Sequence, residues 1–350
     1  MDEVVLGQRG RAAIDFHCAV RGAVAKLQRA VEAELSDAGI TAQTMPEKMD
    51  DRHRLVDATL AESATYGARA LLGEWTAKDH GPICQDAFAE IREAVEPMLK
   101  ALEDGPASLE LDEALKLPAY FEQVWFHRTT GGWDASPHNG FVHGELIHKR
   151  ILTRVFGGNI FGHRRTAAQR APRRDYRHIL DMGASSGHNM VALTEAFPDA
   201  EVSGVDFSAR MLEQARRVAN ARGWAWKLYQ RPCEDTGFAD ESFDLVSSYN
   251  LIHEIPPRII RAVFAEAFRL LEPSGTIIMS DVPRYAEIDR MASWRFDWMA
   301  RWGGEPYWRA ASSTDLVQVA TDAGFTDVDG SVLPGGQPYI LVARKPEAAW

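Results

Sequence analysis

The sequence has few cysteines and no long apolar run. Three cysteines occur in 350 residues, Cys18, Cys84 and Cys233, and no C-x-x-C pair is present. Their odd number and wide spacing give no disulfide framework, which is typical of a reducing cytoplasm. No apolar run approaches the about 18 residues of a membrane-spanning helix, and the first residues, MDEVVLGQRG, lack the pattern of a signal peptide. We therefore expect a cytoplasmic protein without a membrane span.

An excess of positive charge is also absent. The chain has 39 Lys and Arg against 50 Asp and Glu, which gives a net charge of −11. Because clustered Lys and Arg are needed to neutralise phosphates, this balance argues against a nucleic-acid partner. The composition, 45% hydrophobic and 25% charged, is that of an ordinary globular protein. A length of 350 residues favours about two domains.

The most informative stretch runs from residue 178 to residue 206. An apolar run ends at Asp181, a glycine turn spans Gly183 to Gly187, an amphipathic segment covers 189–197, and a second apolar run ends at Asp206. Strand, tight turn, helix and strand together make a βαβ unit. The glycines let the backbone approach a ligand closely, and an acid after the second strand suits ribose hydroxyls. The stretch therefore predicts a nucleoside site.

The spacing of the turn separates this unit from a dinucleotide-binding fold. A pyrophosphate-binding turn reads G-x-G-x-x-G, but Ser185 stands where the middle glycine would be. An acid, Asp181, lies two residues before the first glycine instead. This D-x-G-x-x-x-G pattern with a downstream acid resembles motif I of the class I S-adenosylmethionine-dependent methyltransferases.

Later segments extend this resemblance over roughly residues 175–345. They are the stretch from Asp206, in which Ser208 suits a helix N-cap, the segment 231–238, the loop 247–254 and the turn Leu271-Glu272-Pro273-Ser274-Gly275. Pro232 departs from the family pattern, so an adenine contact falls to Glu234 or to backbone near Cys233. The resemblance implies S-adenosyl-L-methionine as cofactor, S-adenosyl-L-homocysteine as product, and these cofactor-binding residues: Asp181, Gly183, Ala184, Gly187, Asp206, Phe207, Met211, Glu234 and Asn250.

The periodicity divides the chain into two parts. Apolar residues at helical spacing predict helices over 10–36, 50–78, 82–102 and 109–117. Strands are expected at 178–182, 201–205, 226–230, 243–249, 275–281, 326–332 and 338–344, alternating with helices. We expect an α/β fold, a Rossmann-like, mostly parallel sheet (the class I methyltransferase fold). The predicted domains are a helical N-terminal domain at 1–156, a linker at 157–176 and a cofactor-binding catalytic domain at 177–350.

Candidate catalytic residues follow from the chemistry of methyl transfer. The donor carbon is activated by its sulfonium, so the protein mainly aligns the nucleophile and excludes water. A base is needed only when the acceptor must lose a proton. His253 and Glu254, after the fourth strand, lie nearest the expected methyl position, and His143 is a further candidate. Helix-start packing explains His253, and N-terminal helix electrostatics explain Glu254, as alternatives.

Candidate substrate-binding residues come from two aromatic segments, 118–150 and 285–308. They are Tyr120, Trp133, His148, Trp294 and Trp298, and Asp281, at the carboxyl end of an expected strand, is a further candidate. Packing between domains explains both segments as well, and Asp281 also suits capping or pairing with an arginine. His143, Glu145 and His148 suggest a metal site, but a spacing of five residues fits one α-helix face poorly, so we expect no metal.

These observations predict a methyltransferase acting on a small molecule, with the acceptor atom (O, S, C or N) left open. An NAD(P)-dependent oxidoreductase and a non-catalytic S-adenosylmethionine-binding sensor or partner protein are the alternatives. In the family that the chain resembles, helical N-terminal domains commonly pair two subunits or cover the active site, which implies a homodimer or a substrate-covering domain, and we expect a homodimer.

Overall fold

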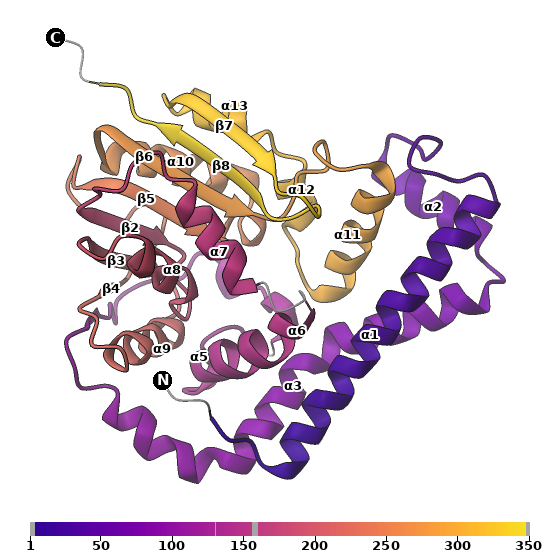
Figure 1. Cartoon of the computed structure of the whole chain (residues 1–350), viewed down its shortest axis with the longest axis horizontal. Helices are drawn as coiled ribbons and strands as arrows, with labels where there is room; N and C mark the ends of the chain where they lie inside the picture. The colour runs from indigo at the N-terminus through magenta and orange to yellow at the C-terminus, as the bar shows by residue number, and fades with distance from the viewer. Residues whose placement is uncertain (1–3, 130, 156–159, 348–350) are drawn as a thin grey trace.

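A computed structural model describes residues 4–129, 131–155 and 160–347. Its centre is an eight-stranded sheet in the order β1-β4-β3-β2-β5-β6-β8-β7 (Figure 1). The strand bounds are β1 Ser108–Glu110, β2 His178–Met182, β3 Glu201–Asp206, β4 Lys227–Gln230, β5 Phe243–Tyr249, β6 Leu271–Asp281, β7 Thr326–Val332 and β8 Tyr339–Arg344. All pairs from β1 to β6 are parallel, and β8 pairs antiparallel with β6 and β7. The predicted fold class is confirmed.

Helices cover both faces of this sheet and bury its apolar side chains. They include α8 (His188–Ala196), α9 (Ala209–Asn220), α10 (Pro257–Leu270) and α13 (Leu316–Asp322). One core cluster joins α10 and α13 to the sheet, and a second joins α8 and α9 to its other face. Ser208 caps α9 as predicted, since its hydroxyl accepts a hydrogen bond from the Met211 amide at 3.2 Å.

The N-terminal part is built on two long helices that lie side by side, α1 (Gln8–Asp37) and α3 (Ala64–Ala101), with α2 (Met49–Thr59) between them in the chain (Figure 1). The predicted helix boundary at Pro82 is wrong, because α3 continues through Pro82 and Pro97. A proline removes one hydrogen bond but need not end a helix that is packed along its length. The break lies at residues 60–63 instead, where the Ser63 hydroxyl caps α3 at the Tyr66 amide.

The predicted helix at 109–117 is also wrong. Residues 108–110 form β1, which pairs in parallel with β4, and the Ser108 amide donates to the Trp226 carbonyl at 2.9 Å. Leu109 and Leu111 alternate with polar residues, and this period of two fits an edge strand. A segment of the predicted helical domain is therefore part of the catalytic sheet.

The chain between the two parts is largely helical. It contains α4 (Ala119–Glu122), η1 (Phe126–Arg128), α5 (Asn139–Phe141), the π-helix η2 (Val142–Leu152), α6 (Thr153–Val155) and α7 (Ile160–Gln169). Residues 160–169 of the predicted linker are thus helix α7, while residues 157–159 lie outside the described part. Phe161 of α7 contacts the ring of His188 at the start of α8, with centroids 5.1 Å apart.

An insertion between β6 and α13 bridges the two parts of the molecule. It holds α11 (Arg290–Gly303) and α12 (Trp308–Ser312), and α12 contacts η3 (Ile252–Glu254), the short helix that follows β5. Helix α11 is followed by Gly304 in a left-handed conformation, φ 77°. Helix α11 packs against α3, where a Cβ atom at Gly73 would lie 2.9 Å from Cη2 of Trp298. Among the described residues, no helix is both long and apolar enough to cross a membrane.

Candidate active site

One cavity of about 640 Å³ opens at the carboxyl ends of the parallel strands. Ligands of open α/β sheets bind at this edge. Its floor is formed by residues that follow β2, β3, β5 and β6, and its walls come from α1, α3, η2 and α11. The N-terminal helices thus enclose a space that the sheet alone would leave open.

The turn after β2 and the acid after β3 form one corner of the cavity. Gly183 adopts φ 76°, and a Cβ atom there would lie 3.2 Å from Leu251. The Asp206 carboxylate accepts hydrogen bonds from the amides of Ser185 at 2.8 Å and Ser208 at 2.9 Å. Burial nevertheless raises the pKa of Asp206 to about 6. Asp206 therefore presents a fixed carboxylate to a ligand in this corner.

Three residues predicted to bind the cofactor do not line the cavity. Asp181 is fully buried, accepts from the Asn189 side-chain amide at 2.7 Å, and burial raises its pKa to about 7. Ala184 is buried under the turn. Gly187 (φ 84°) begins α8, and a Cβ atom there would lie 2.9 Å from the Trp226 ring. These residues shape the turn, while Gly183, Asp206, Phe207, Met211, Glu234 and Asn250 line the cavity.

The next corner joins residues from both parts of the chain. The Tyr120 hydroxyl donates a hydrogen bond to the Glu234 carboxylate, and both side chains line the cavity. Burial, together with this carboxylate, raises the pKa of Tyr120 well above its usual value. A predicted substrate residue and a predicted cofactor residue are thus bonded to each other. Asn250 follows β5 in a left-handed conformation, φ 63°.

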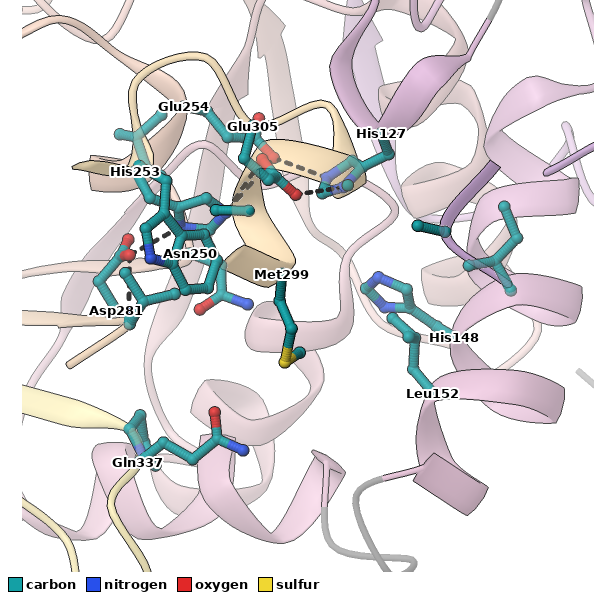
Figure 2. Close-up of a pocket in the computed structure, with 18 of the residues that line it drawn as sticks. His127, His148, Leu152, Asn250, His253, Glu254, Asp281, Met299, Glu305 and Gln337 are labelled. Atoms are coloured by element: carbon teal, nitrogen blue, oxygen red, sulfur yellow. Dashed lines mark hydrogen bonds and ion pairs between the residues drawn. The ribbon is translucent and has the colours of Figure 1, made fainter. Parts of the chain in front are cut away.

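His253 is held by an acid at the end of the neighbouring strand. Its Nδ1 lies 2.7 Å from Oδ1 of Asp281, while Nε2 is directed toward the carboxylates of Glu254 at 3.9 Å and Glu305 at 4.0 Å (Figure 2). Asp281 is itself fixed by the amides of Ile252 and Val282, each at 2.7 Å. Burial alone would lower the pKa of His253, but the adjacent carboxylates raise it to about 9.

A second histidine, His127, faces the same two glutamates from the opposite wall. Its Nδ1 lies 2.6 Å from Glu305 and its Nε2 lies 3.2 Å from Glu254 (Figure 2). Burial disfavours its charged form, yet these carboxylates raise its pKa well above the ordinary value. His127 adopts φ 50°, a strained backbone conformation of the kind that clusters at functional sites.

The histidines of η2 correct one expectation from the sequence. His143 and His148 do share a helix face, with ring centroids 4.4 Å apart, because a π-helix has more residues per turn than an α-helix. Nδ1 of His148 lies 3.0 Å from Nδ1 of His188. Burial lowers the pKa of all three, that of His143 to about 3. Within the described ranges, no three His, Cys, Asp or Glu side chains are grouped to hold a metal ion.

Comparisons with known proteins decide the class of this site. A family model described as "Methyltransferase domain" matches residues 179–275. An uncharacterized methyltransferase of Synechocystis sp. is 28% identical over 173 residues, which cover 47% of this chain and 74% of the relative. The demethylmenaquinone methyltransferase of Thermus thermophilus is 31% identical over 137 residues, which cover 38% of this chain and 59% of the relative. Residues 179–275 are therefore part of a class I S-adenosylmethionine-dependent methyltransferase domain.

Among solved structures, the pyocyanin biosynthetic protein PhzM aligns with a TM-score of 0.47 and 14% identity, over 58% of this methyltransferase and 60% of that chain. The N-terminal helices lie outside the segment that the family model matches. The family match therefore says nothing about these helices, and their function is inferred from the structure of this chain alone.

The cavity fits the cofactor of this family. S-adenosylmethionine supplies an activated methyl group when bound. Gly183 leaves space that a side chain would fill, and Asp206 offers its carboxylate where two adjacent amides hold it. The roles of individual residues in holding the cofactor remain predictions.

The predicted catalytic and substrate residues of the methyltransferase mostly meet in this cavity. His253, Glu254, His143, Tyr120, Trp133, His148, Asp281 and Trp298 line it. Trp294 does not, because its ring is fully buried in a separate core cluster with residues of α1 and α2. The aromatic pattern of 285–308 predicted both tryptophans, but it does not distinguish a lining residue from a core residue.

Many lining residues were not predicted as site residues, and among them are the charged or titratable side chains of His127, Glu305 and Arg69. Glu305 lies in the Gly303-Gly304-Glu305-Pro306 break, and an acid in a glycine-proline break of an aromatic segment is a signal that the sequence did contain. Arg69 lies in a helical stretch with no motif around it, so only the packing of α3 against α11 identifies it.

Proposed function

We propose that this methyltransferase methylates a hydroxyl group of a small, planar, largely apolar molecule, with His253 as the proton acceptor. The observation that supports this most is the His253–Asp281 pair. Nδ1 is bonded to a buried carboxylate that is itself fixed by two amides, so the ring orientation is set and Nε2 is free of a hydrogen bond to any described residue. A base placed in this way is useful only when the acceptor atom carries a proton.

The walls around His253 favour an aromatic acceptor. Trp308 contacts the His253 ring with centroids 5.1 Å apart, and Trp133 contacts His127 with centroids 5.2 Å apart. Flat aromatic walls offer stacking and edge contacts to a planar ring. The name of the Thermus relative, a demethylmenaquinone methyltransferase, is consistent with an acceptor of this kind.

Two groups of side chains, His253 with Asp281 and His127 with Glu254 and Glu305, determine where the proton from the acceptor hydroxyl goes. Neutral His253 accepts it at Nε2, and the Asp281 carboxylate stabilises the resulting imidazolium. Glu254 and Glu305 lie between His253 and His127, and their negative charge stabilises the protonated form of His127. His143 and His148 remain neutral because of burial, so they offer hydrogen bonds rather than charge. Their roles in catalysis and substrate binding are part of this proposal.

Two further expectations also belong to the proposal, a homodimer and a cytoplasmic location. Support for the homodimer comes from Phe16 of α1 and Leu71 of α3, apolar side chains that are 61% and 69% exposed on the two long helices. Sedimentation velocity of wild type and of the double variant Phe16→Ser, Leu71→Ser tests it. A wild-type monomer at micromolar concentration contradicts the homodimer. Cell fractionation tests the location, and recovery outside the cytoplasm contradicts it.

A transfer assay with isotopically labelled S-adenosylmethionine tests the proposed reaction. Phenols and hydroxynaphthalenes, each beside its parent without the hydroxyl, serve as acceptors. We expect label only in hydroxylated compounds, and His253→Asn to lower kcat by about 10²–10⁴-fold. His178→Asn, an exposed histidine at the start of β2, is the matched control and is expected to retain full activity. Absence of transfer to every hydroxyl, or an undiminished His253→Asn variant, would contradict the proposal.

A further inference from the structure

The end of the cavity farthest from the sheet contains a buried arginine. Arg69 lies on α3, lines the cavity, and is 2% exposed. Its guanidinium carbon lies 3.4 Å from the ring centroid of Trp298 on α11. Gly73, one turn later on the same face of α3, allows this close approach, because a Cβ atom there would meet the indole. Figure 1 shows α11 lying against α3 at this point.

Two of the three guanidinium nitrogens of Arg69 make no hydrogen bond to a described residue. Its Nε and Nη1 atoms are buried and have no acceptor among the described residues. Buried guanidinium groups normally carry hydrogen bonds to a carboxylate, a carbonyl or a ligand, since an unpaired buried charge is costly. The stacked indole compensates this charge in part. Burial accordingly lowers the pKa of Arg69 to about 10.

Glu32 on α1, an acid that lines the cavity, already has other partners. Its Oε1 accepts hydrogen bonds from Arg295 at 2.9 Å and from the Gln28 side-chain amide at 2.8 Å. Arg21, Arg29 and Arg295 also line the cavity. Around them the wall is apolar, formed by Val24, Ala25, Ala77, Trp298 and Met299. This region combines excess positive charge with a hydrophobic surface.

We propose that Arg69 binds a carboxylate of the methyl acceptor, so that the natural acceptors are hydroxylated aromatic carboxylic acids. The inference deepens the proposed function and rests on it for the identity of the reacting group. A carboxylate supplies the acceptors that the guanidinium lacks, and charge-assisted hydrogen bonds are the stronger kind. The apolar walls hold the ring that connects the carboxylate to the hydroxyl near His253. Arg69 is thereby a specificity-determining residue.

Binding of probes that cannot be methylated on oxygen tests this inference separately from turnover. Benzoate and 2-naphthoate are titrated by calorimetry into the full chain with S-adenosylhomocysteine present, beside the neutral benzamide and 2-naphthamide. We expect at least one carboxylate to bind about tenfold or more tightly than its amide. Arg69→Met is expected to remove this preference, and Arg69→Lys to retain part of it, because the charge remains without the planar group.

Arg92→Met is the matched control, since Arg92 lies on the same helix, is exposed, and forms an ion pair with Glu96 at 2.7 Å. It is expected to keep the full preference. Arg69→Gln, which keeps donors and removes charge, replaces Arg69→Met if the latter does not fold by circular dichroism. Equal binding of carboxylate and amide to the wild type, failure of both carboxylates to bind at millimolar concentration, or a preference that survives in Arg69→Met or Arg69→Gln overturns the inference. If neutral phenols are methylated and an added carboxylate increases neither binding nor the rate of methylation, this inference is refuted and the proposed function is not.

Discussion

Nδ1 of His253 lies 2.7 Å from Oδ1 of Asp281; His253 lies in η3, which follows β5, and Asp281 ends the neighbouring parallel strand β6. The pairing of β5 with β6 therefore brings this imidazole and this carboxylate together, although they are 28 residues apart in sequence. The orientation of the Asp281 carboxylate is fixed, because two backbone amides donate hydrogen bonds to its oxygens. This relationship gives a defined prediction for the dependence of the reaction on pH.

The rate of methyl transfer to a hydroxyl is expected to rise with pH toward a plateau above about pH 9. In the proposed reaction the neutral form of His253 accepts the proton, and its fraction grows as pH rises through the raised pKa of about 9. Asp281→Asn removes the carboxylate that stabilises the imidazolium, so the midpoint should shift to lower pH while the plateau rate falls. The measurement is kcat/KM from pH 6 to 10 for both proteins. A wild-type profile that is flat, or a midpoint that Asp281→Asn leaves in place, would exclude His253 as the base.

Asp297 connects the insertion to the N-terminal helices. It is 3% exposed and accepts from His53 of α2 at 2.8 Å, from Tyr285 at 2.8 Å and from Nε of Arg309 at 2.7 Å. Although burial alone would raise the pKa of Asp297, these donors hold it below its ordinary value. Asp297→Asn should lower the free energy of unfolding by about 2–3 kcal/mol, since it leaves buried donors without their charged acceptor.

The pH dependence of this effect has a defined sign. A depressed pKa stabilises the fold above the unfolded-state pKa, and the contribution is lost as pH falls through the folded-state pKa. The difference between wild type and Asp297→Asn in urea unfolding should thus be full at pH 7 and smaller at pH 3. Asp51→Asn, which breaks an exposed pair with Arg54, is the control, with an expected effect of about 0–1 kcal/mol. Equal effects for the two variants would show that Asp297 does not connect these elements.

The sequence predicted the sheet and one side of the cavity well. Alternation of short apolar runs with helical segments placed seven strands within a few residues, because a buried parallel strand reads as an apolar run bounded by turns. Asp206 and Asn250 follow such strands and line the cavity. These positions follow from local pattern and from the topology of parallel sheets.

The other side of the cavity depends on contacts that local pattern does not encode. Helix α3 continues through Pro82, so Arg69 is placed by the packing of one long helix against α11. The π-helical turn of η2 brings His143 beside His148, which the spacing of an α-helix would separate. His127 reaches Glu254 and Glu305 from a strained turn 127 residues before Glu254 in the chain. Each of these relations is tertiary.

We expect the corner formed by Gly183 and Asp206 to bind the methyl donor, and calorimetric titration measures this binding. S-adenosylhomocysteine, NADH and NADPH are titrated into wild type and Asp206→Ala. We expect micromolar binding of S-adenosylhomocysteine alone, weakened about tenfold or more in the variant, because the charged carboxylate no longer accepts hydrogen bonds from the ligand. Binding of NADH or NADPH in its place, or an affinity for S-adenosylhomocysteine that Asp206→Ala leaves unchanged, would contradict it.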